Sequence, residues 1–213
     1  MINIKNLNSN HLAPSFTKIN SSKIYNMYLD EWCIDKKKNI IFLCITKCAS
    51  TSLKKCLEQI EYEITIYDRL ESDIVKYKNV QFYSIIREPE SRYISGLNFF
   101  INRYFQGNNL NLIEQNLNKE KFIFDEHTLC QHYFLDKIIK HHNVNLIRLD
   151  KNINEKISDI LGVNVSLPRL NSLDEQKNNY TEFCKDMYKK YCVNNENYLN
   201  LYDKDYSLYN SSI

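Results

Sequence analysis

The chain has 213 residues, of which 43% are hydrophobic and 25% are charged, and its formal net charge is +2. This composition is typical of a globular domain with its own core, and the near-neutral charge gives no signature of nucleic-acid binding. No apolar stretch approaches the ~18 residues that a membrane-spanning helix needs, and residues 1–10 do not resemble a signal peptide. We therefore expect one soluble domain over residues 1–213, with residues 1–20 as a loosely ordered lead-in.

The cysteines indicate a reducing environment. They are seven in number and scattered, with no C-x-x-C pair. Such usage is typical of free thiols rather than of a disulfide framework. The spacing of cysteine and histidine residues matches no zinc pattern, so we expect no metal.

The first informative stretch is a hairpin that leads into a buried strand. Residues 24–29 and 32–34 have a strand pattern that enters a polar turn at residues 35–39. Ile40–Ile45 is then a continuous, β-branched apolar run, which predicts a buried strand. A helical pattern starts at Leu53, and the hydroxyl residues Ser50–Ser52 before it are good N-cap residues.

A strand, a tight turn and a helix N-terminus together form a cradle for an anion. Backbone N–H groups and the positive end of the helix dipole point at whatever is bound there. Lys47 adds a positive charge and Ser50–Ser52 add hydroxyl donors, so the stretch predicts a phosphate or sulfate site. The alternative is an ordinary strand-to-helix turn with an exposed lysine. The stretch fails the Walker A pattern, because its lysine precedes the turn and the glycines lie elsewhere, at Gly96, Gly107 and Gly162.

A second anion-binding stretch is predicted around Arg87. Val80–Ile86 is an apolar strand pattern that ends at Arg87, and Pro89 suits the first turn of a following helix. Arg92 and Ser95 share one face of that helix. An arginine at a strand end and a serine on the adjoining helix can reach one phosphate, so Arg87 and Ser95 are candidate ligands. Arg92 is either a further ligand or a structural ion-pair partner of a nearby glutamate.

The alternation of strands and helices continues to the end of the chain. Phe122–His142 carries a helical stripe of apolar residues, in which His127 and Gln131 stand at i and i+4 and share a face. Further elements are expected as strands over Tyr62–Tyr67 and Asn143–Leu149, and as helices over Glu90–Phe105, Ile153–Leu161 (ended by Gly162) and Tyr180–Tyr191.

The two anion-binding stretches resemble the cofactor-binding elements of sulfotransferases that use 3′-phosphoadenosine 5′-phosphosulfate (PAPS). T-K-C-A-S-T-S-L at 46–53 resembles the 5′-phosphosulfate loop P-K-x-[AG]-[ST]-T-[ST]-L, with Thr46 in place of the usual proline. R-E-P-E-S-R-Y-I-S at 87–95 resembles the 3′-phosphate element R-[DE]-P-x-x-R-x-x-S, particularly in the carbohydrate branch that includes uronyl and chondroitin-type enzymes. Weaker matches at 170–172 and 202–206 extend the resemblance over about residues 40–206.

The resemblance implies a P-loop-like three-layer α/β fold with a central parallel sheet flanked by helices. It implies PAPS as the donor, 3′-phosphoadenosine 5′-phosphate (PAP) as the product, and a hydroxyl acceptor that we expect on a carbohydrate. Lys47 would act on the bridging and leaving-group oxygens as a catalytic residue. The 3′-phosphate would be held by Arg87 and Ser95, and the 5′-phosphate by Lys47, Cys48, Ala49, Ser50, Thr51 and Ser52.

For the general base that takes the acceptor proton, His127 is the first choice. In this family a histidine in a D-x-H-x-x-x-Q context often lies near the acceptor, although His127 can also cap or pack at a helix start. Several carbohydrate sulfotransferases place their base between the two cofactor elements, where this chain has no histidine. The fallback is therefore the acidic cluster of Asp68, Glu71 and Asp73.

Two other functions stay open at this point. One is a non-catalytic relative that binds PAP or an anionic glycan, and the other is an atypical nucleotide-dependent kinase. The kinase needs a magnesium-binding carboxylate after a strand, and none stands out at Arg87-Glu88. No nucleic-acid or membrane partner is expected. Golgi relatives in the family carry a membrane anchor, so the lack of a membrane-spanning stretch here favours a cytoplasmic protein of bacterial or viral origin.

Overall fold

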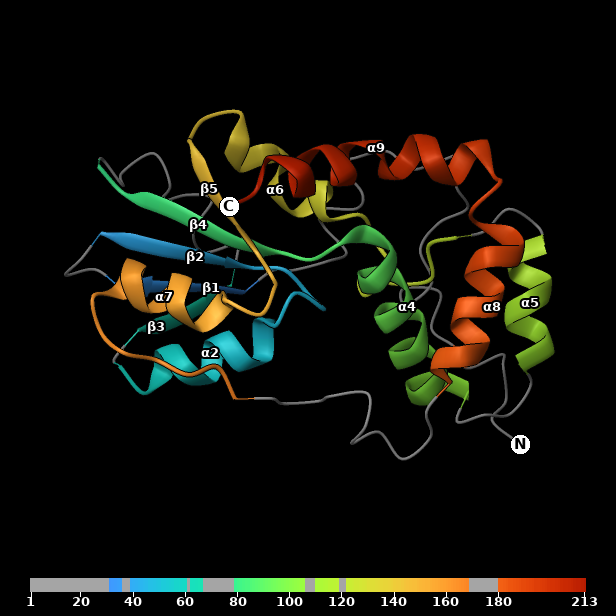
Figure 1. Cartoon of the computed structure of the whole chain (residues 1–213), viewed down its shortest axis with the longest axis horizontal. Helices are drawn as coiled ribbons and strands as arrows, with labels where there is room; N and C mark the ends of the chain where they lie inside the picture. Colours follow the sequence, from blue (N-terminus) through green and yellow to red (C-terminus); the bar gives the residue numbers. More distant parts are fainter. Residues whose placement is uncertain are drawn as a thin grey trace. The chain divides into compact units, whose positions relative to one another are not determined.

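The computed structural model describes residues 31–35, 39–60, 62–66, 79–105, 110–118, 122–168 and 180–213 (Figure 1). These residues fall into two compact units. The sheet unit comprises the described residues of Leu29–Glu88, Gln131–Leu170 and Asp205–Ile213. The helical unit comprises those of Pro89–Cys130 and Asn171–Lys204. The single domain expected over residues 1–213 stays a prediction.

The sheet unit is built on one five-stranded sheet of β1 (Glu31–Asp35), β2 (Ile40–Cys44), β3 (Glu63–Ile66), β4 (Gln81–Ile86) and β5 (Val144–Arg148). The strands stand in the order β3-β1-β2-β4-β5. β2 pairs with β4 and β4 with β5 in parallel, whereas β1 pairs antiparallel with both β2 and β3. The sheet is therefore mixed, and the expected parallel sheet is present as β2, β4 and β5.

The predicted hairpin is confirmed as the β1–β2 pair, in which Trp32 lies opposite Leu43. Two strands joined by a turn this short can only run antiparallel, because a parallel pair needs a long crossover. The other half of the hairpin prediction, residues 24–29, lies outside the described residues. Every residue of β2 is buried, as its continuous apolar run predicts for a strand covered on both faces.

Helices cover both faces of this sheet. Figure 1 shows α2 (Ser50–Glu58) and α7 (Ile153–Leu161) on one face and α6 (Gln131–Ile139) on the other. α7 ends where the sequence predicts, because Gly162 takes the left-handed conformation with φ 65° that glycine adopts without strain. The α/β fold class is confirmed by this alternation of buried strands and covering helices.

The outer edge of β5 is covered by the last residue of the chain. The Arg148 N–H donates to the Ile213 carbonyl at 2.7 Å, and the Ile213 N–H donates to the Leu146 carbonyl at 3.1 Å. The Arg148 guanidinium donates to the Tyr209 carbonyl at 3.0 Å and lies over the Tyr209 ring. These contacts satisfy backbone groups that an open sheet edge leaves exposed.

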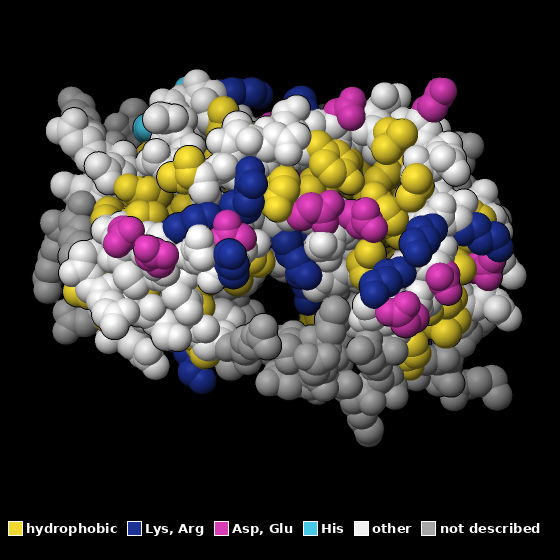
Figure 2. Space-filling model, viewed as in Figure 1, with side chains coloured by type: hydrophobic (Ala, Val, Ile, Leu, Met, Phe, Trp, Pro, Cys, Tyr) yellow, Lys and Arg dark blue, Asp and Glu magenta, His cyan; other side chains and the backbone are white. Residues whose placement is uncertain are grey.

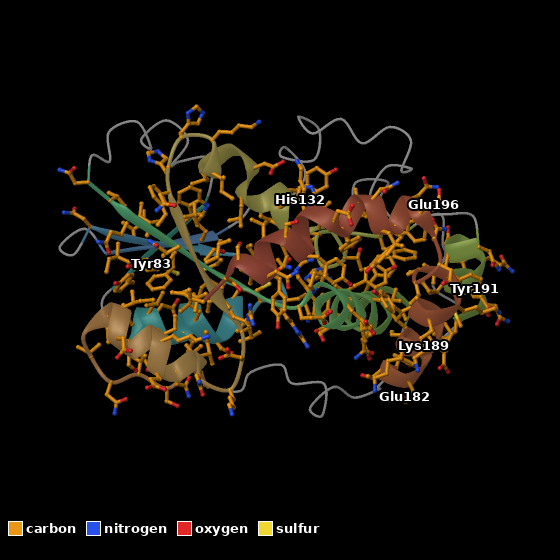
Figure 3. The ribbon with its side chains drawn as sticks, turned by 45° about the horizontal axis from the view of Figure 1, so that its top comes forward. Tyr83, His132, Glu182, Lys189, Tyr191 and Glu196 are labelled. Carbon is orange, nitrogen blue, oxygen red and sulfur yellow. The ribbon has the colours of Figure 1, made fainter. Side chains whose placement is uncertain are left out.

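The helical unit contains α4 (Pro89–Phe100), the π-helix η5 (Ile101–Phe105), α5 (Leu110–Asn118), α8 (Thr181–Tyr191) and the first part of α9 (Glu196–Ser211). The helix expected over Glu90–Phe105 is α4 followed by η5. Tyr191, at the C-terminal end of α8 in Figure 3, donates to a Glu114 carboxylate oxygen at 2.6 Å and so joins α8 to α5.

Tyrosine rings form the core of the helical unit. The Tyr93 ring centroid lies 5.9 Å from that of Tyr188 and 5.5 Å from that of Tyr198, and the Tyr93 hydroxyl donates to the Phe122 carbonyl at 2.9 Å. Burial raises the pKa of Tyr93 well above its ordinary value, so this hydroxyl stays protonated as a donor.

The cysteines are thiols, as the sequence predicted, and all seven are buried. In the helical unit, burial raises the pKa of Cys184 and of Cys192 to about 12. A thiol with so high a pKa carries almost no reactive thiolate at neutral pH, so these two side chains act as small core residues.

The surface carries mixed charges. On the face shown in Figure 2, Lys and Arg side chains are interspersed with Asp and Glu side chains and form no continuous band of one sign. No helix in the part of the chain that the structure describes has the length and apolarity to cross a bilayer.

Gly96→Ala tests the packing of α4. A Cβ atom at Gly96 would lie 2.0 Å from the His127 carbonyl oxygen and 2.6 Å from its carbonyl carbon. In an open helix this change stabilises by about 1 kcal/mol. Here backbone must move, so we expect the free energy of unfolding, measured in urea, to fall by about 2–4 kcal/mol.

Gly162→Ala is the control. No atom lies within 4 Å of a Cβ there, so it should lose only the cost of a left-handed alanine, about 1 kcal/mol. Equal losses at the two glycines would contradict the contact between α4 and His127.

Candidate functional site

The predicted anion cradle lies between β2 and α2. Lys47 and Ala49 both take the left-handed conformation, with φ of 64° and 59°. In most proteins glycine occupies such positions, and each non-glycine residue costs about 1–2 kcal/mol there. The turn is closed by hydrogen bonds from the Cys48 N–H to the Ile45 carbonyl at 3.2 Å and from the Leu53 N–H to the Ala49 carbonyl at 2.9 Å. A costly backbone shape held by such bonds is typical of a functional loop.

The hydroxyl residues occupy the first turn of α2. Its N-cap is Ala49, which makes no side-chain cap hydrogen bond, so the expectation that Ser50–Ser52 would supply the N-cap is wrong. The left-handed Ala49 closes the turn one residue earlier than the sequence pattern suggested, which leaves Ser50 as the first helical residue. Thr51 is exposed, Ser50 half-buried and Ser52 buried. The first-turn N–H groups of α2 can therefore serve an anion together with the hydroxyls of Ser50 and Thr51.

Arg87 directly follows β4 and lies beside this loop. Because β2 and β4 are parallel neighbours, Lys47 and Arg87 emerge at the same edge of the sheet. An Arg87 guanidinium N–H donates to the Lys47 carbonyl at 3.4 Å. Both side chains are half-buried. The structure thus brings together Lys47, the loop after it and Arg87, all within the sheet unit.

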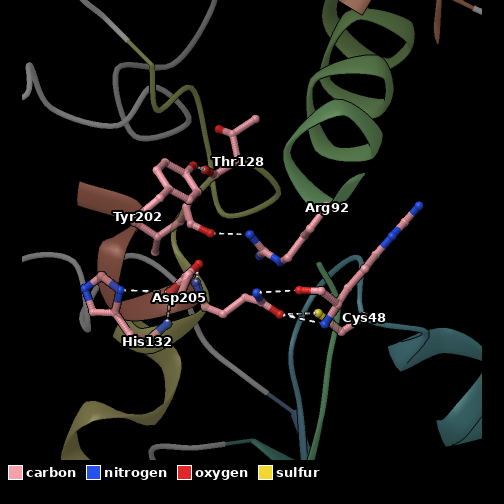
Figure 4. Close-up of polar contacts among 9 residues, drawn as sticks. Cys48, Arg92, Thr128, His132, Tyr202 and Asp205 are labelled. Atoms are coloured by element: carbon pink, nitrogen blue, oxygen red, sulfur yellow. Dashed lines mark hydrogen bonds and ion pairs between the residues drawn. The ribbon is translucent and has the colours of Figure 1, made fainter. Parts of the chain in front are cut away.

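The side-chain amide of Gln131 connects the loop to Arg87. Its Oε1 accepts from the Arg87 backbone N–H at 2.9 Å and from the Cys48 thiol at 3.1 Å, and its Nε2 donates to the Arg87 carbonyl at 2.8 Å (Figure 4). Gln131 is fully buried. We call these three hydrogen bonds the Gln131 clamp.

Asp205 holds Gln131 in place from the other side. Its buried carboxylate accepts from the backbone N–H groups of Gln131 at 2.6 Å and His132 at 2.8 Å, the first two residues of α6. It also lies 2.9 Å from Nδ1 of His132, which Figure 4 shows. An acidic side chain at this place satisfies first-turn N–H groups and complements the helix dipole. Sequence reasoning missed Asp205 as a partner of Gln131; its signal was the weak match at residues 202–206.

Ser95 and His127 belong to the helical unit. Ser95 lies on α4, as expected, and is buried. Arg92 on the same helix is almost fully buried, and its guanidinium donates to the Leu129 carbonyl and, at 3.3 Å, to the Glu126 carbonyl. Of the alternatives for Arg92, these contacts with backbone carbonyls favour a structural role.

The helix expected over Phe122–His142 begins only at Gln131, so the prediction that His127 and Gln131 share a helix face is wrong. Residues 126–128 form a turn instead, and no residue from 122 to 130 is helical. The Thr128 hydroxyl accepts from the Phe124 N–H at 2.8 Å, and the Asp125 carboxylate accepts from the His127 N–H at 2.9 Å. Such local side-chain bonds compete with a helix, which explains the late start.

His127 nevertheless has the surroundings of an oriented imidazole. Its Nδ1 lies 2.9 Å from the buried Asp125 carboxylate, and its ring packs on Phe99 with centroids 4.2 Å apart. Since Nδ1 is engaged with a carboxylate, Nε2 is the ring nitrogen that can accept a proton. Side-chain ligand atoms of Asp125, Glu126 and His127 lie within 4.8 Å of one another, but both carboxylate oxygens of Asp125 bond to His127 itself.

The fallback bases Asp68, Glu71 and Asp73 lie outside the described residues, as does the expected match at Asn171-Ser172. A second lysine, Lys54, follows the loop on α2. Burial lowers the pKa of its ammonium, and the opposing charge of Glu58 raises it by less.

Asp205→Asn tests the support of α6. In the asparagine, an NH₂ group replaces one of the two carboxylate oxygens. A donor then faces a backbone N–H group at the start of α6, where an acceptor is needed. We expect the free energy of unfolding to fall by about 2–3 kcal/mol, and amide hydrogen exchange at Gln131 and His132 to become faster. Asp159→Asn, at an exposed position of α7, is the control. A loss at Asp205 no larger than that at Asp159 would contradict the assignment.

No protein-family model, curated protein or solved structure matches this chain.

Proposed function

We propose that the chain is a PAPS-dependent sulfotransferase with a P-loop-like three-layer fold, which transfers a sulfuryl group from PAPS to a hydroxyl of a carbohydrate. One observation carries the proposal. The Lys47 loop and Arg87 follow parallel neighbouring strands, so both cationic side chains emerge at the carboxyl edge of the sheet, where open α/β sheets bind their ligands.

The loop suits the 5′ end of the donor. Backbone N–H groups of the first turn of α2 and the hydroxyls of Ser50 and Thr51 bind the 5′-phosphate. The Lys47 ammonium neutralises the charge that develops on the bridging oxygen as the sulfur–oxygen bond breaks. Arg87 binds the 3′-phosphate, bidentately by its guanidinium geometry, and so distinguishes PAPS from ATP. Ser95 joins Arg87 in this role on the strength of the sequence resemblance.

The reaction is an in-line displacement. The acceptor oxygen forms a bond to sulfur while the bond from sulfur to the phosphate oxygen breaks, and the electron pair of that bond stays on departing PAP. On the strength of the sequence resemblance alone, His127 is assigned as the base that takes the proton of the acceptor hydroxyl. Its Nδ1 is held by Asp125, which leaves Nε2 to accept the proton. Catalysis then consists of positioning and charge stabilisation, and we assign no step to a metal ion.

Isothermal titration calorimetry tests the donor assignment. PAP should bind more tightly than ADP or ATP and without magnesium. Arg87→Ala should weaken PAP binding by about 10–100-fold, the range for a charged hydrogen-bond pair. Lys47→Ala should lower kcat for sulfuryl transfer from PAPS by about 100–1,000-fold. Lys55→Ala, an exposed lysine on α2, is the matched control and should change neither.

The competing functions give different results. Magnesium-dependent preference for ATP would overturn the proposal in favour of a kinase. Tight PAP binding that survives Lys47→Ala, with no transfer by either form, would favour a non-catalytic binding protein.

A further inference from the structure

One buried amide joins the two parts of the proposed donor site. The Gln131 clamp contacts the loop through the Cys48 thiol and the end of β4 through both backbone groups of Arg87. The clamp therefore bonds to Arg87 itself and to Cys48, the residue that follows Lys47. The Arg87 guanidinium bond to the Lys47 carbonyl closes the same set of contacts.

An amide suits this position for a specific reason. The parallel ladder between β4 and β5 ends with Ile86 opposite Arg148, one residue before Arg87. A glutamine side chain offers one acceptor and one donor, which match the Arg87 N–H and carbonyl. The clamp therefore fixes the backbone from which the Arg87 side chain extends.

The main chain of Gln131 is itself held in place. Asp205 accepts from the Gln131 N–H at 2.6 Å and is fully buried, so the main chain of Gln131 is fixed at the start of α6. The side chain is fixed by its three hydrogen bonds. A glutamine held at both ends sets the distance between the loop and Arg87 instead of following it.

We infer that Gln131 is a positioning residue that determines donor specificity, because it holds the loop and Arg87 at the spacing of the two phosphates of a 3′,5′-bisphosphorylated adenosine. This inference rests on the proposed function. A ligand with both phosphates contacts the loop and Arg87 together, and the second contact benefits from the first only if the spacing is correct. Adenosine 5′-monophosphate (AMP) lacks the 3′-phosphate and depends on the loop alone.

The experiment compares PAP and AMP binding by calorimetry in Gln131→Met, which keeps the side-chain shape without its hydrogen bonds. We expect the Kd for PAP to rise at least about tenfold, which corresponds to losing one charged hydrogen bond between Arg87 and the 3′-phosphate. The Kd for AMP should change less than about threefold. Melting temperature is recorded in parallel. A merely structural role would lower the melting temperature but leave the ratio of the two Kd values unchanged, and that result would overturn the inference.

Asn145→Leu is the matched control. Asn145 also uses a side-chain amide to bond the β4 backbone, to the Phe82 carbonyl at 3.2 Å, but near the opposite end of the strand. The Asn145→Leu substitution should lower stability and leave the ratio of the Kd values for PAP and AMP as in the wild type. A ratio that falls equally in Asn145→Leu and Gln131→Met would also overturn the inference.

Cys48 provides a milder second test if Gln131→Met does not fold. Cys48→Ala removes one of the three bonds and should lower the preference for PAP over AMP by about threefold, and Cys48→Ser, which keeps a donor, should restore it. An unchanged preference in Cys48→Ala would contradict the role of the clamp. Wild-type protein that binds PAP no better than AMP would instead refute the proposed function, and the inference would fall with it.

Discussion

Ile40 lies opposite Gln81 and Leu43 opposite Ser84 in the parallel ladder of β2 and β4. This pairing makes the two strands end at one edge of the sheet, and every other feature of the candidate site depends on it. It brings the loop after β2 and the residue after β4 within hydrogen-bonding distance although they are 40 positions apart in the chain. Burial of all five β2 residues stabilises the pairing, since a slip in register would move the loop away from Arg87.

The backbone conformation of the loop after β2 is unfavourable in free energy. Two left-handed residues without glycine cost about 2–4 kcal/mol together, and the hydrogen bonds around them offset this cost. Each buried bond contributes about 1 kcal/mol, and the Gln131 clamp supplies one at the loop, from the Cys48 thiol, and two at Arg87. Strain at a loop that is over-determined by its surroundings is a recurrent property of ligand-binding sites, where the shape must exist before the ligand arrives.

The parts of this arrangement that depend on local patterns were predictable. The apolar runs of β2, β4 and β5 and the glycine that ends α7 lie where the sequence indicates. The long-range contacts were not predictable, because no sequence pattern indicates that Asp205 bonds to Gln131, 74 positions away in the chain. The turns before α6 were missed for a local reason: Asp125 and Thr128 bond nearby N–H groups and delay a helix that hydrophobic spacing alone extends back to Phe122.

Phosphorus NMR of PAP tests the central claim most directly, because the 3′- and 5′-phosphates give separate resonances. We expect both resonances to shift when PAP binds the wild-type protein. In Arg87→Ala, under concentrations at which PAP is still bound, the 3′ resonance should return toward its position in free PAP while the 5′ resonance remains shifted. A 5′ resonance that loses its shift in Arg87→Ala while the 3′ resonance keeps it, or a wild-type protein that shifts neither, would contradict the assignment of the loop and Arg87 to the two phosphates.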